Sequence, residues 1–522
     1  MTDTRPESPA TDYTALFTQA LSEHPGQGMP VLRTVSASAS PASMPKAFLS
    51  VPDASTPAAL PVGHEVLAEL RSQASGKIGE AAGADASMTE EDRRQRGQSI
   101  IVQVVSEWAT KFTAASGQDL TPQQERAVRE AVFDELFRAG RLQPLLDDAH
   151  VENIIIYGDK VRVDYADRPT RTWDPIAKTD RDLVNLINHL ARMQGQGERA
   201  LTPATPNLNL RLADGSRLAA SAYVTPRPSI VIRRHRTRGQ GLDDLVRWGT
   251  IDASLAHFLR AAVKGRKNVI VVGSQGVGKT SLLRAMAREI PRAERVGTLE
   301  SEYELHLHED PEGPEVVAYE GRESNGERGA DGRLQGELTL SDLFPQLLRM
   351  SLRRVIVGEV RSKEVVPMLH AMNEGEGGSM ATLHARSPQL SIERLATLCL
   401  EAGIGMTEAL AYRLIAQAVD FVVYVRLVDE SELVGPDGRT GRKHRFVSHV
   451  MEITGIGEGG RPSHQMVFAP REQDGRREPR AVPHGNISQT CLEDLVRAGL
   501  DRSVLQRPWG SWGAPLETVV PL

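Results

Sequence analysis

The chain is poor in cysteine, since only Cys399 and Cys491 occur among its 522 residues. The two lie far apart and belong to no Cys/His ligand spacing, which argues against a disulfide framework and against a zinc site. Such low cysteine usage is typical of a reducing compartment. We therefore expect a cytoplasmic protein.

Long apolar runs are missing as well. No run approaches the ~20 residues that a membrane-spanning helix needs. The first residues, MTDTRPESPATDY, lack the charged-then-apolar pattern of a signal peptide. We expect no direct insertion into a membrane, so any contact with one is expected to be peripheral.

The chain also lacks an excess of basic or aromatic residues. Its formal net charge is −6, and aromatic residues make up 4% of it. A nonspecific nucleic-acid binder needs a broad basic field, and a single-strand translocase needs aromatic side chains on which bases stack. We therefore do not expect nucleic acid as a partner.

The chain is long enough to form two or three domains. Residues 1–60 are rich in Ala, Ser, Pro and Thr, and we expect them to be disordered. A helical region follows over 61–148, with apolar residues at helical spacing from Ile100 to Phe112 and from Val128 to Leu136.

A small mixed α/β domain is predicted over residues 149–238. Strands at 153–157 and 161–165 are joined at Gly158–Asp159, a helix covers 182–193, and short strands follow around a turn at Asp214–Gly215. Strand and helix patterns then alternate to about residue 427, as a parallel sheet requires. We assign residues 239–455 to this second domain and 456–522 to a variable tail with one short helix at 492–498.

The stretch VIVVGSQGVGKTSLL combines an apolar run, a glycine loop and a helix-like repeat. It fits the phosphate-binding pattern G-x-x-x-x-G-K-[ST]. Glycines let the backbone curl so that N–H groups point at phosphate oxygens, and the following helix adds its positive end. The expected nucleotide-binding residues are Gly273, Ser274, Gln275, Gly276, Val277, Gly278, Lys279, Thr280 and Ser281.

Within this loop two side chains have distinct expected roles. Lys279 is expected to meet the β and γ phosphates of ATP, and the hydroxyl of Thr280 to hold Mg²⁺. A carboxylate at the end of a neighbouring strand is also required, and RRVIVGEVR supplies Glu359 for the metal shell and the attacking water.

Three further residues follow short apolar strands or a glycine loop. Glu300 and Glu304 lie in VGTLESEYELHL, and His384 lies in NEGEGGSMATLHARSP. A solvated surface acid is an equally good interpretation of Glu304, and a lone histidine is most often structural.

The order of these segments resembles the secretion ATPases of type II and type IV secretion, and most closely the CpaF-type subfamily of Flp/Tad pilus assembly. The resemblance rests on the phosphate loop, TLESEYEL, VIVGEVR and GGSMATLHARSP. Upstream it extends through GRLQPLLDDAHVENIIIYG, LNLRLADGSRL and SIVIRRH, so it covers about residues 125–455.

The resemblance implies a RecA-like P-loop core preceded by a smaller α/β domain and N-terminal helices. It implies that Gly273–Thr280 form the Walker A loop and that Glu359 is the Walker B glutamate. It further implies that Glu300 and Glu304 are the carboxylates of the acidic box. His384 is then the histidine-box residue that senses the γ-phosphate.

Two arginines of the smaller domain, Arg217 and Arg233, are implied to contact the phosphates. Independently, a planar guanidinium suits the negative charge that a phosphoryl-transfer transition state spreads over its oxygens. The alternative for the cluster between Arg227 and Arg238 is a solvated face or an acidic protein partner.

The resemblance further implies a homo-oligomer, a hexameric ring, whose hydrolysis of ATP moves one domain against the other. Its work at a membrane implies docking on an integral membrane platform protein. We expect the N-terminal segment and the helices around Ile100 to Leu136 to carry that contact, with Val104, Trp108 and Phe112 on the apolar face.

The sequence departs from the family pattern in several places. Ser301 stands where the acidic box usually has Asp, and Glu376 where the histidine box usually opens with His. LRMSLRRV replaces the usual LRMRPDRI, and the loop YEGRESNGERGADGRLQGE is longer than expected. Since Lys279 and Glu359 are retained, we expect binding and basal hydrolysis to survive and coupling between subunits to be altered.

Two other functions stay open. One is a nucleic-acid translocase or helicase on a RecA-like core. The other is a nucleotide-binding regulator whose site has degraded, an alternative that the departures support.

Overall fold

A computed structural model describes residues 62–520, except 85–88, 117–118, 167, 194–199, 235–238, 323, 325–335, 404 and 436–437. The disorder expected for residues 1–60 lies outside the described residues, as does most of the long loop expected after Tyr319. The described residues all belong to one compact unit within Ala59–Leu522, and all that follows concerns that unit.

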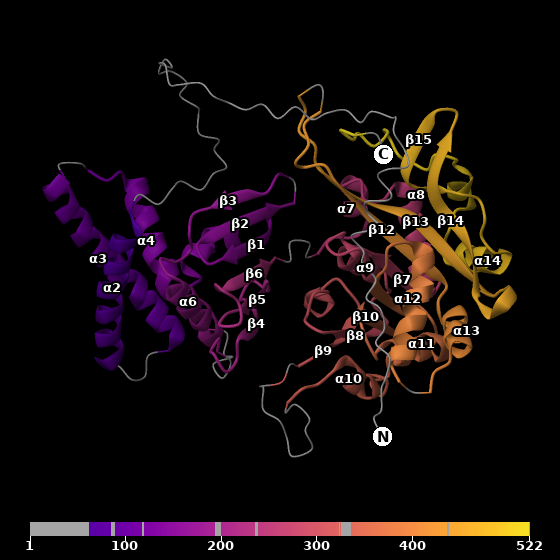
Figure 1. Cartoon of the computed structure of the whole chain (residues 1–522), viewed down its shortest axis with the longest axis horizontal. Helices are drawn as coiled ribbons and strands as arrows, with labels where there is room; N and C mark the ends of the chain where they lie inside the picture. Colours follow the sequence, from indigo (N-terminus) through magenta and orange to yellow (C-terminus); the bar gives the residue numbers. More distant parts are fainter. Residues whose placement is uncertain are drawn as a thin grey trace, which may run out of the picture. The chain divides into compact units, whose positions relative to one another are not determined.

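This unit begins with three helices that pack on one another, α2 (His64–Ala84), α3 (Glu90–Ser116) and α4 (Pro122–Phe137) (Figure 1). At the start of α4, Thr121 and Gln124 form a capping box. Val104 is 1% exposed inside the core of this bundle. Val104 therefore stabilises the bundle itself, and the contact expected between this region and a membrane platform protein stays a prediction.

The smaller domain follows η1 (Gly140–Leu142) and α5 (Gln143–Asp147). It contains α6 (Asp180–Met193) and a six-stranded antiparallel sheet in the order β3-β2-β1-β6-β5-β4. The predicted hairpin at Gly158–Asp159 is present between the first two strands. The strands are β1 (Val151–Tyr157), β2 (Lys160–Tyr165), β3 (Arg171–Trp173), β4 (Asn207–Arg211), β5 (Arg217–Ser221) and β6 (Ser229–Arg233).

Buried apolar residues alternate with more exposed residues along β5 and β6, so one face of this sheet is apolar and the other carries polar side chains. Leu218 and Ile232 are buried register partners in the core that includes Ile187 of α6. Because successive side chains of a strand point to opposite faces, Arg217 and Arg233 lie on the other face, where they are also register partners.

The larger domain is built on a nine-stranded sheet in the order β15-β14-β13-β12-β7-β11-β10-β8-β9. The six strands from β9 to β12 in this order are parallel, as the alternating pattern predicted. They are β7 (Val269–Gly273), β8 (Arg295–Glu300), β9 (Glu315–Glu320), β10 (Arg354–Val360), β11 (Met380–His384) and β12 (Phe421–Asp429).

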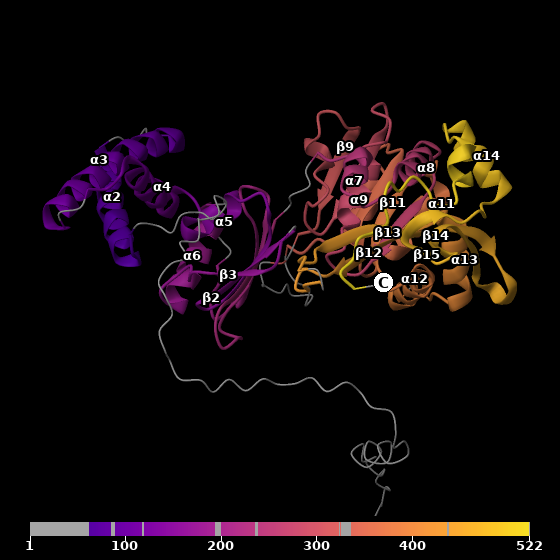
Figure 2. The ribbon, with the colours of Figure 1, turned by 90° about the horizontal axis from the view of Figure 1, so that it is seen from above.

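Helices cover both faces of this sheet (Figure 1 and Figure 2). On β7, Val269 and Val271 belong to the core with α8 and α9, whereas Ile270 and Val272 belong to the core with α11, α12 and α13. A strand buried on both faces reads as a continuous apolar run. The helices are α7 (Leu242–Arg247), α8 (Ala253–Lys264), α9 (Lys279–Ala287), α10 (Leu340–Leu347), α11 (Val365–Glu374), α12 (Pro388–Glu401) and α13 (Glu408–Ala418).

The sheet does not end near residue 455, where we placed the start of a tail. β13 (Lys443–Ile456) pairs with β14 (Pro462–Gln473), which pairs with β15 (Arg476–Pro483). The helix α14 (Gln489–Arg497) follows and places Leu495 in the core beside α8, and η4 (Arg502–Gln506) comes after it. The many Gly, Arg and Pro residues of this stretch hide the strand pattern in the sequence. The strands form because their backbones pair with β13 and with each other.

Among the described residues, no helix has the length and apolar character that crossing a membrane requires.

Candidate functional site

The phosphate loop joins the end of β7 to the start of α9. Glycine is needed at Gly273, since φ is 155° and an added Cβ would lie 2.5 Å from the carbonyl oxygen of Val425. Gly276 and Gly278 also have positive φ values, 73° and 100°. The predicted loop is thus present as a strand, a turn that favours glycine, and a helix.

Lys279 opens α9 with its side chain turned into the loop. It is 7% exposed, and its Nζ donates a hydrogen bond of 2.9 Å to the carbonyl oxygen of Ser274. Nζ also lies 3.3 Å from Nδ1 of His384. Burial lowers the pKa of Lys279 to about 8, while Glu359 opposes this shift.

Glu359 and His384 come together at the carboxyl ends of β10 and β11, which are neighbouring parallel strands. Oε1 of Glu359 lies 2.8 Å from Nε2 of His384, and Oε2 accepts a hydrogen bond of 2.6 Å from Arg361. Burial, together with the positive charge of Lys279, lowers the pKa of His384 below its usual value. Both effects favour the neutral form of the imidazole.

The acidic segment after β8 adds two carboxyl groups. Glu300 is 2% exposed, and its Oε2 accepts backbone hydrogen bonds of 2.8 Å from both Glu304 and Leu305. Burial raises the pKa of Glu300 to about 7. The side chain of Glu304 is 18% exposed and accepts a hydrogen bond of 3.0 Å from the Thr280 hydroxyl. The surface-acid interpretation of Glu304 is therefore wrong.

Arg217 reaches this segment from the smaller domain, where it forms ion pairs with Glu302 and Glu304. Arg233, its neighbour across β5 and β6, adds positive charge that lowers the pKa values of Lys279 and His384. Both arginines therefore act electrostatically on the groups around the phosphate loop.

The remaining residues of the predicted loop have different surroundings. Val277 is 3% exposed and packs in the hydrophobic core, and Ser281 lies in the first turn of α9. Gln275 lines a cavity of about 350 Å³ whose other walls are Glu359, Val360, Arg361, Leu383, His384 and Arg394. This cavity lies next to the carboxylate and histidine that the sequence singled out.

Three arginines at the site were missed by the sequence reasoning. Arg361 contacts Glu359, and its place in GEVR was an available signal. Arg284 is 4% exposed and donates a hydrogen bond of 2.7 Å to the carbonyl oxygen of Glu304. Arg445 donates to the carbonyl oxygen of Gly276 at 3.2 Å. Neither of these two has a sequence signal, because both act through folded contacts.

Two departures from the family pattern contact each other. Arg353, from LRMSLRRV, donates hydrogen bonds of 2.8 Å to both carboxylate oxygens of Glu376. Arg266 lies 3.0 Å from the same carboxylate. These arginines hold the pKa of Glu376 below its usual range, with the hydrogen bond from Arg353 as the main cause.

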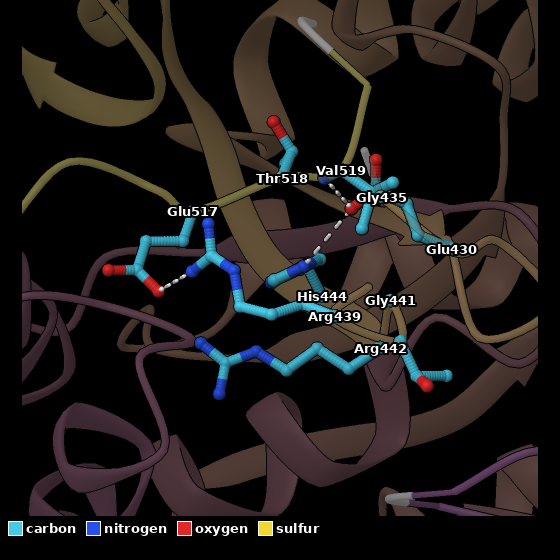
Figure 3. Close-up of a pocket in the computed structure, with 10 residues that line it drawn as sticks. Glu430, Gly435, Arg439, Gly441, Arg442, His444, Glu517, Thr518 and Val519 are labelled. Atoms are coloured by element: carbon cyan, nitrogen blue, oxygen red, sulfur yellow. Dashed lines mark hydrogen bonds and ion pairs between the residues drawn. The ribbon is translucent and has the colours of Figure 1, made fainter. Parts of the chain in front are cut away.

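A second cavity, of about 400 Å³, lies where the turn between β12 and β13 meets the C-terminal segment (Figure 3). Glu430 is 3% exposed there and accepts backbone hydrogen bonds from Val519 and Val520 at 2.8 and 2.9 Å. None of the predicted site residues lines this cavity. Its contacts hold the C-terminal segment on the larger domain.

Comparison with known proteins places these features in a family. The model of the type II/IV secretion system protein family matches residues 147–454. A putative conjugal transfer protein of Mycobacterium tuberculosis is 32% identical over 301 residues, which are 56% of this chain and 81% of that protein. The type IV secretion system protein VirB11 of Brucella suis is 26% identical over 334 residues, 59% of this chain and 89% of that one.

An uncharacterised protein of Methanocaldococcus jannaschii is 31% identical over 255 residues, and the match covers 47% of this chain but only 33% of that protein. The family model, in contrast, matches more than half of this chain, and it includes the phosphate loop, Glu359 and His384. The chain therefore belongs to the type II/IV secretion system protein family.

Proposed function

We propose that the chain is the ATP-hydrolysing motor of a secretion system or of a Flp/Tad-type, CpaF-like pilus assembly system. It is an ATPase of the type II/IV secretion family. One observation carries the proposal: Lys279, the Glu359–His384 pair, the Glu304–Thr280 pair and Arg217 from the smaller domain converge on a single loop.

ATP binding rests on the loop itself. The backbone N–H groups around Gly276 and the N-terminal end of α9 receive phosphate oxygens, and Lys279 contacts the β and γ phosphates. A Lys279 side chain that is already buried and turned toward the Ser274 carbonyl supports this role. Little side-chain entropy is then lost when the nucleotide enters.

Magnesium fits the oxygen donors available in the site. Thr280 offers a hydroxyl, and Glu304 and Glu359 offer carboxylates, the donor types that this hard cation prefers. We propose Thr280 and Glu359 as the groups that hold it, directly or through water. When bound, the ion neutralises the charge on the phosphate oxygens.

Hydrolysis uses Glu359 to orient and polarise the attacking water. A neutral His384 at 2.8 Å holds that carboxylate in place, and Arg361 fixes its other oxygen. Because Glu359 is supported on both oxygens, it is a better candidate than Glu300, whose carboxyl is buried and tied to the backbone.

The small-domain arginines complete the site. Arg217 is paired with Glu302 and Glu304, so phosphate oxygens compete with these carboxylates for its guanidinium. Arg233 stabilises the charge that develops on the transferring phosphoryl group. Nucleotide state is thereby coupled to the position of the smaller domain.

The motor acts as a homo-oligomer, a hexameric ring, and docks on an integral membrane platform protein of its system. The working location is the cytoplasm, peripheral to the inner face of the membrane. Family membership supports this assembly, and the exchange of Arg217 between carboxylates and phosphate supplies the domain movement that such a motor needs.

The test is the ATPase rate measured against protein concentration with Mg²⁺, with particle mass measured in parallel. We expect specific activity to rise as a six-subunit particle forms. Absence of Mg-dependent hydrolysis would contradict the proposed ATPase activity. A constant specific activity from monomers would contradict the proposed ring. A many-fold increase with single-stranded DNA, or tight binding to protein-free anionic vesicles, would favour a translocase or direct lipid contact over platform docking.

A further inference from the structure

Arg445 on β13 contacts the phosphate loop from outside the segments that the family pattern singles out. Its Nε donates a hydrogen bond of 3.2 Å to the carbonyl oxygen of Gly276. Its Cδ would lie 3.9 Å from a Cβ added to Gly278, so the side chain lies along the turn. Arg445 therefore contacts the part of the loop in which backbone conformation decides phosphate binding.

The other end of the same guanidinium contacts the smaller domain. One terminal nitrogen of Arg445 donates to both carboxylate oxygens of Glu152 on β1, each at 2.9 Å. The side chains of Arg445 and Glu152 are 24% and 26% exposed, so water screens the pair only in part. A charge-assisted contact of this kind is stronger than a hydrogen bond between neutral groups.

Glu152 is itself tied to the strand that carries Arg233. The Glu152 carbonyl accepts a backbone hydrogen bond of 3.0 Å from Arg234, and the adjacent Asn153 is the register partner of Arg233. A continuous path thus runs from the Gly276 carbonyl through Arg445 and Glu152 to the β6 end that presents Arg233.

We propose that Arg445 is a positioning residue for ATP hydrolysis, which holds the Gly276 turn and the Arg233 strand in one fixed relation through Glu152. The inference rests on the proposed function. This role differs from that of a simple ion pair between the domains. Arg445 must contact Gly276 and Glu152 at the same time to hold the phosphate loop in its binding conformation.

Lys443 offers a matched control on the same strand. Its Nζ donates a hydrogen bond of 3.2 Å to the carbonyl oxygen of Tyr165 on β2 and lies 3.9 Å from Oδ2 of Asp429; among the described residues, neither partner belongs to the phosphate loop. Lys443→Met thus removes a contact between β13 and the smaller domain without touching Gly276.

The experiment measures the dissociation constant of a fluorescent ATP analogue, with kcat and KM in parallel, for wild type and for Arg445→Gln, Glu152→Gln, the double variant and Lys443→Met. We expect each of the first two changes to raise the dissociation constant and KM by about 10-fold or more, since each breaks a charge-assisted contact. The double variant should be no worse than Arg445→Gln, and Lys443→Met should match wild type.

The charge swap Glu152→Arg with Arg445→Glu separates positioning from simple bridging. The swap restores an ion pair between the domains, but a carboxylate cannot donate to the Gly276 carbonyl, so nucleotide affinity should stay weak. Full recovery of affinity in the swap, or wild-type affinity in Arg445→Gln, would overturn the inference. Thermal unfolding midpoints of all variants are measured to check that each is folded. If wild type itself does not bind the ATP analogue, the proposed function fails. If wild type binds it and Arg445→Gln binds it equally well, only the inference about Arg445 fails.

Discussion

Glu300 is a buried carboxyl group with an unusual balance of contacts. Oε2 accepts two backbone hydrogen bonds, while Oε1 is buried without a hydrogen-bond partner among the described residues. Burial favours the neutral acid and raises its pKa to about 7, from 4.5. The protonation state of this group therefore changes near physiological pH.

The raised pKa predicts a pH-dependent stability. A group whose pKa is higher in the folded state contributes stability that is fully present below its unfolded pKa, and this contribution is lost as pH rises through about 7. We expect wild type to lose up to about 3 kcal/mol from this group between pH 5 and pH 8.

Glu300→Gln isolates the effect, since its amide oxygen still accepts both backbone hydrogen bonds but does not ionise. Chemical unfolding of both proteins at pH 5 and pH 8, without nucleotide, measures the difference. Identical pH slopes for the two proteins would contradict the predicted shift.

Lys279→Ala is expected to abolish tight ATP binding. It removes a positive charge held beside the Ser274 carbonyl and inside the loop that we propose to receive the β and γ phosphates. Equilibrium binding of labelled ATP is the measurement, and Lys443→Met serves as the control for loss of a lysine outside the loop. Unchanged affinity in Lys279→Ala would sink the phosphate-loop assignment.

Glu359→Gln should separate binding from chemistry. The neutral amide fits the same space but polarises water poorly, so ATP should be retained while kcat falls on the order of 10²-fold. Single-turnover hydrolysis together with ATP affinity checks this. A wild-type rate in this variant would shift the catalytic role to Glu300 or Glu304.

At the scale of elements, the open face of the smaller sheet is an arginine surface that meets an acidic segment. Arg217 pairs with Glu302 and Glu304, and Arg211 lies 3.2 Å from Glu320 while its guanidinium stacks over Tyr303. Strand alternation keeps these arginines on one face, and the acids follow or end β8 and β9. Two elements distant in sequence thereby form one electrostatic surface.

The strands β14 and β15 belong to the hydrophobic core of the larger domain. Phe468 of β14 is fully buried, and its ring centroid lies 5.1 Å from that of Phe258 on α8. Ala481 of β15 and Leu495 of α14 belong to the same core.

A chain that stops at residue 455 is therefore expected to be insoluble or to unfold without cooperativity. It loses Phe468 and Leu495, each worth about 2–5 kcal/mol when a buried side chain of its size is removed. Soluble yield and calorimetric unfolding are the readouts. A stop after residue 506 is the control, and a cooperative transition near the wild-type temperature in the 455 variant would show that these strands are dispensable.

For the whole molecule, the proposed site draws on both domains. Lys279 on α9 and Glu359 on β10 belong to the larger domain, as does Glu304, whereas Arg217 and Arg233 belong to the smaller one. ATP hydrolysis should then depend on domain closure, and a truncated core is the direct test.

A core that begins near residue 241 should lose turnover on the order of 10²-fold or more, because it lacks the two arginines that we propose as transition-state donors. Removal of residues 1–60 is the matched control and is expected to leave the ATPase rate nearly intact. Rates are compared at equal concentrations of oligomer. Full activity in the core would rule out the role of Arg217 and Arg233.

The sequence by itself determined the local parts of this protein. Positive φ values favour glycine at Gly276 and Gly278, and a strand buried on both faces needs an apolar run, so the loop between β7 and α9 was predictable. Two strand patterns joined at Gly158–Asp159 also predicted the hairpin. The alternation of strand and helix patterns predicted the parallel sheet of the larger domain. These are properties of neighbouring residues, and periodicity records them.

Only the tertiary structure decided which side chains meet. The parallel strands lie in the order β9-β8-β10-β11-β7-β12, which is not their order in the chain, so β7 lies between strands that come much later. That order brings His384 to Lys279, and folding brings Glu304 to Thr280 and Arg445 to Gly276. Contacts between residues so far apart in sequence leave no local pattern, because only packing of the complete sheet and both domains creates them.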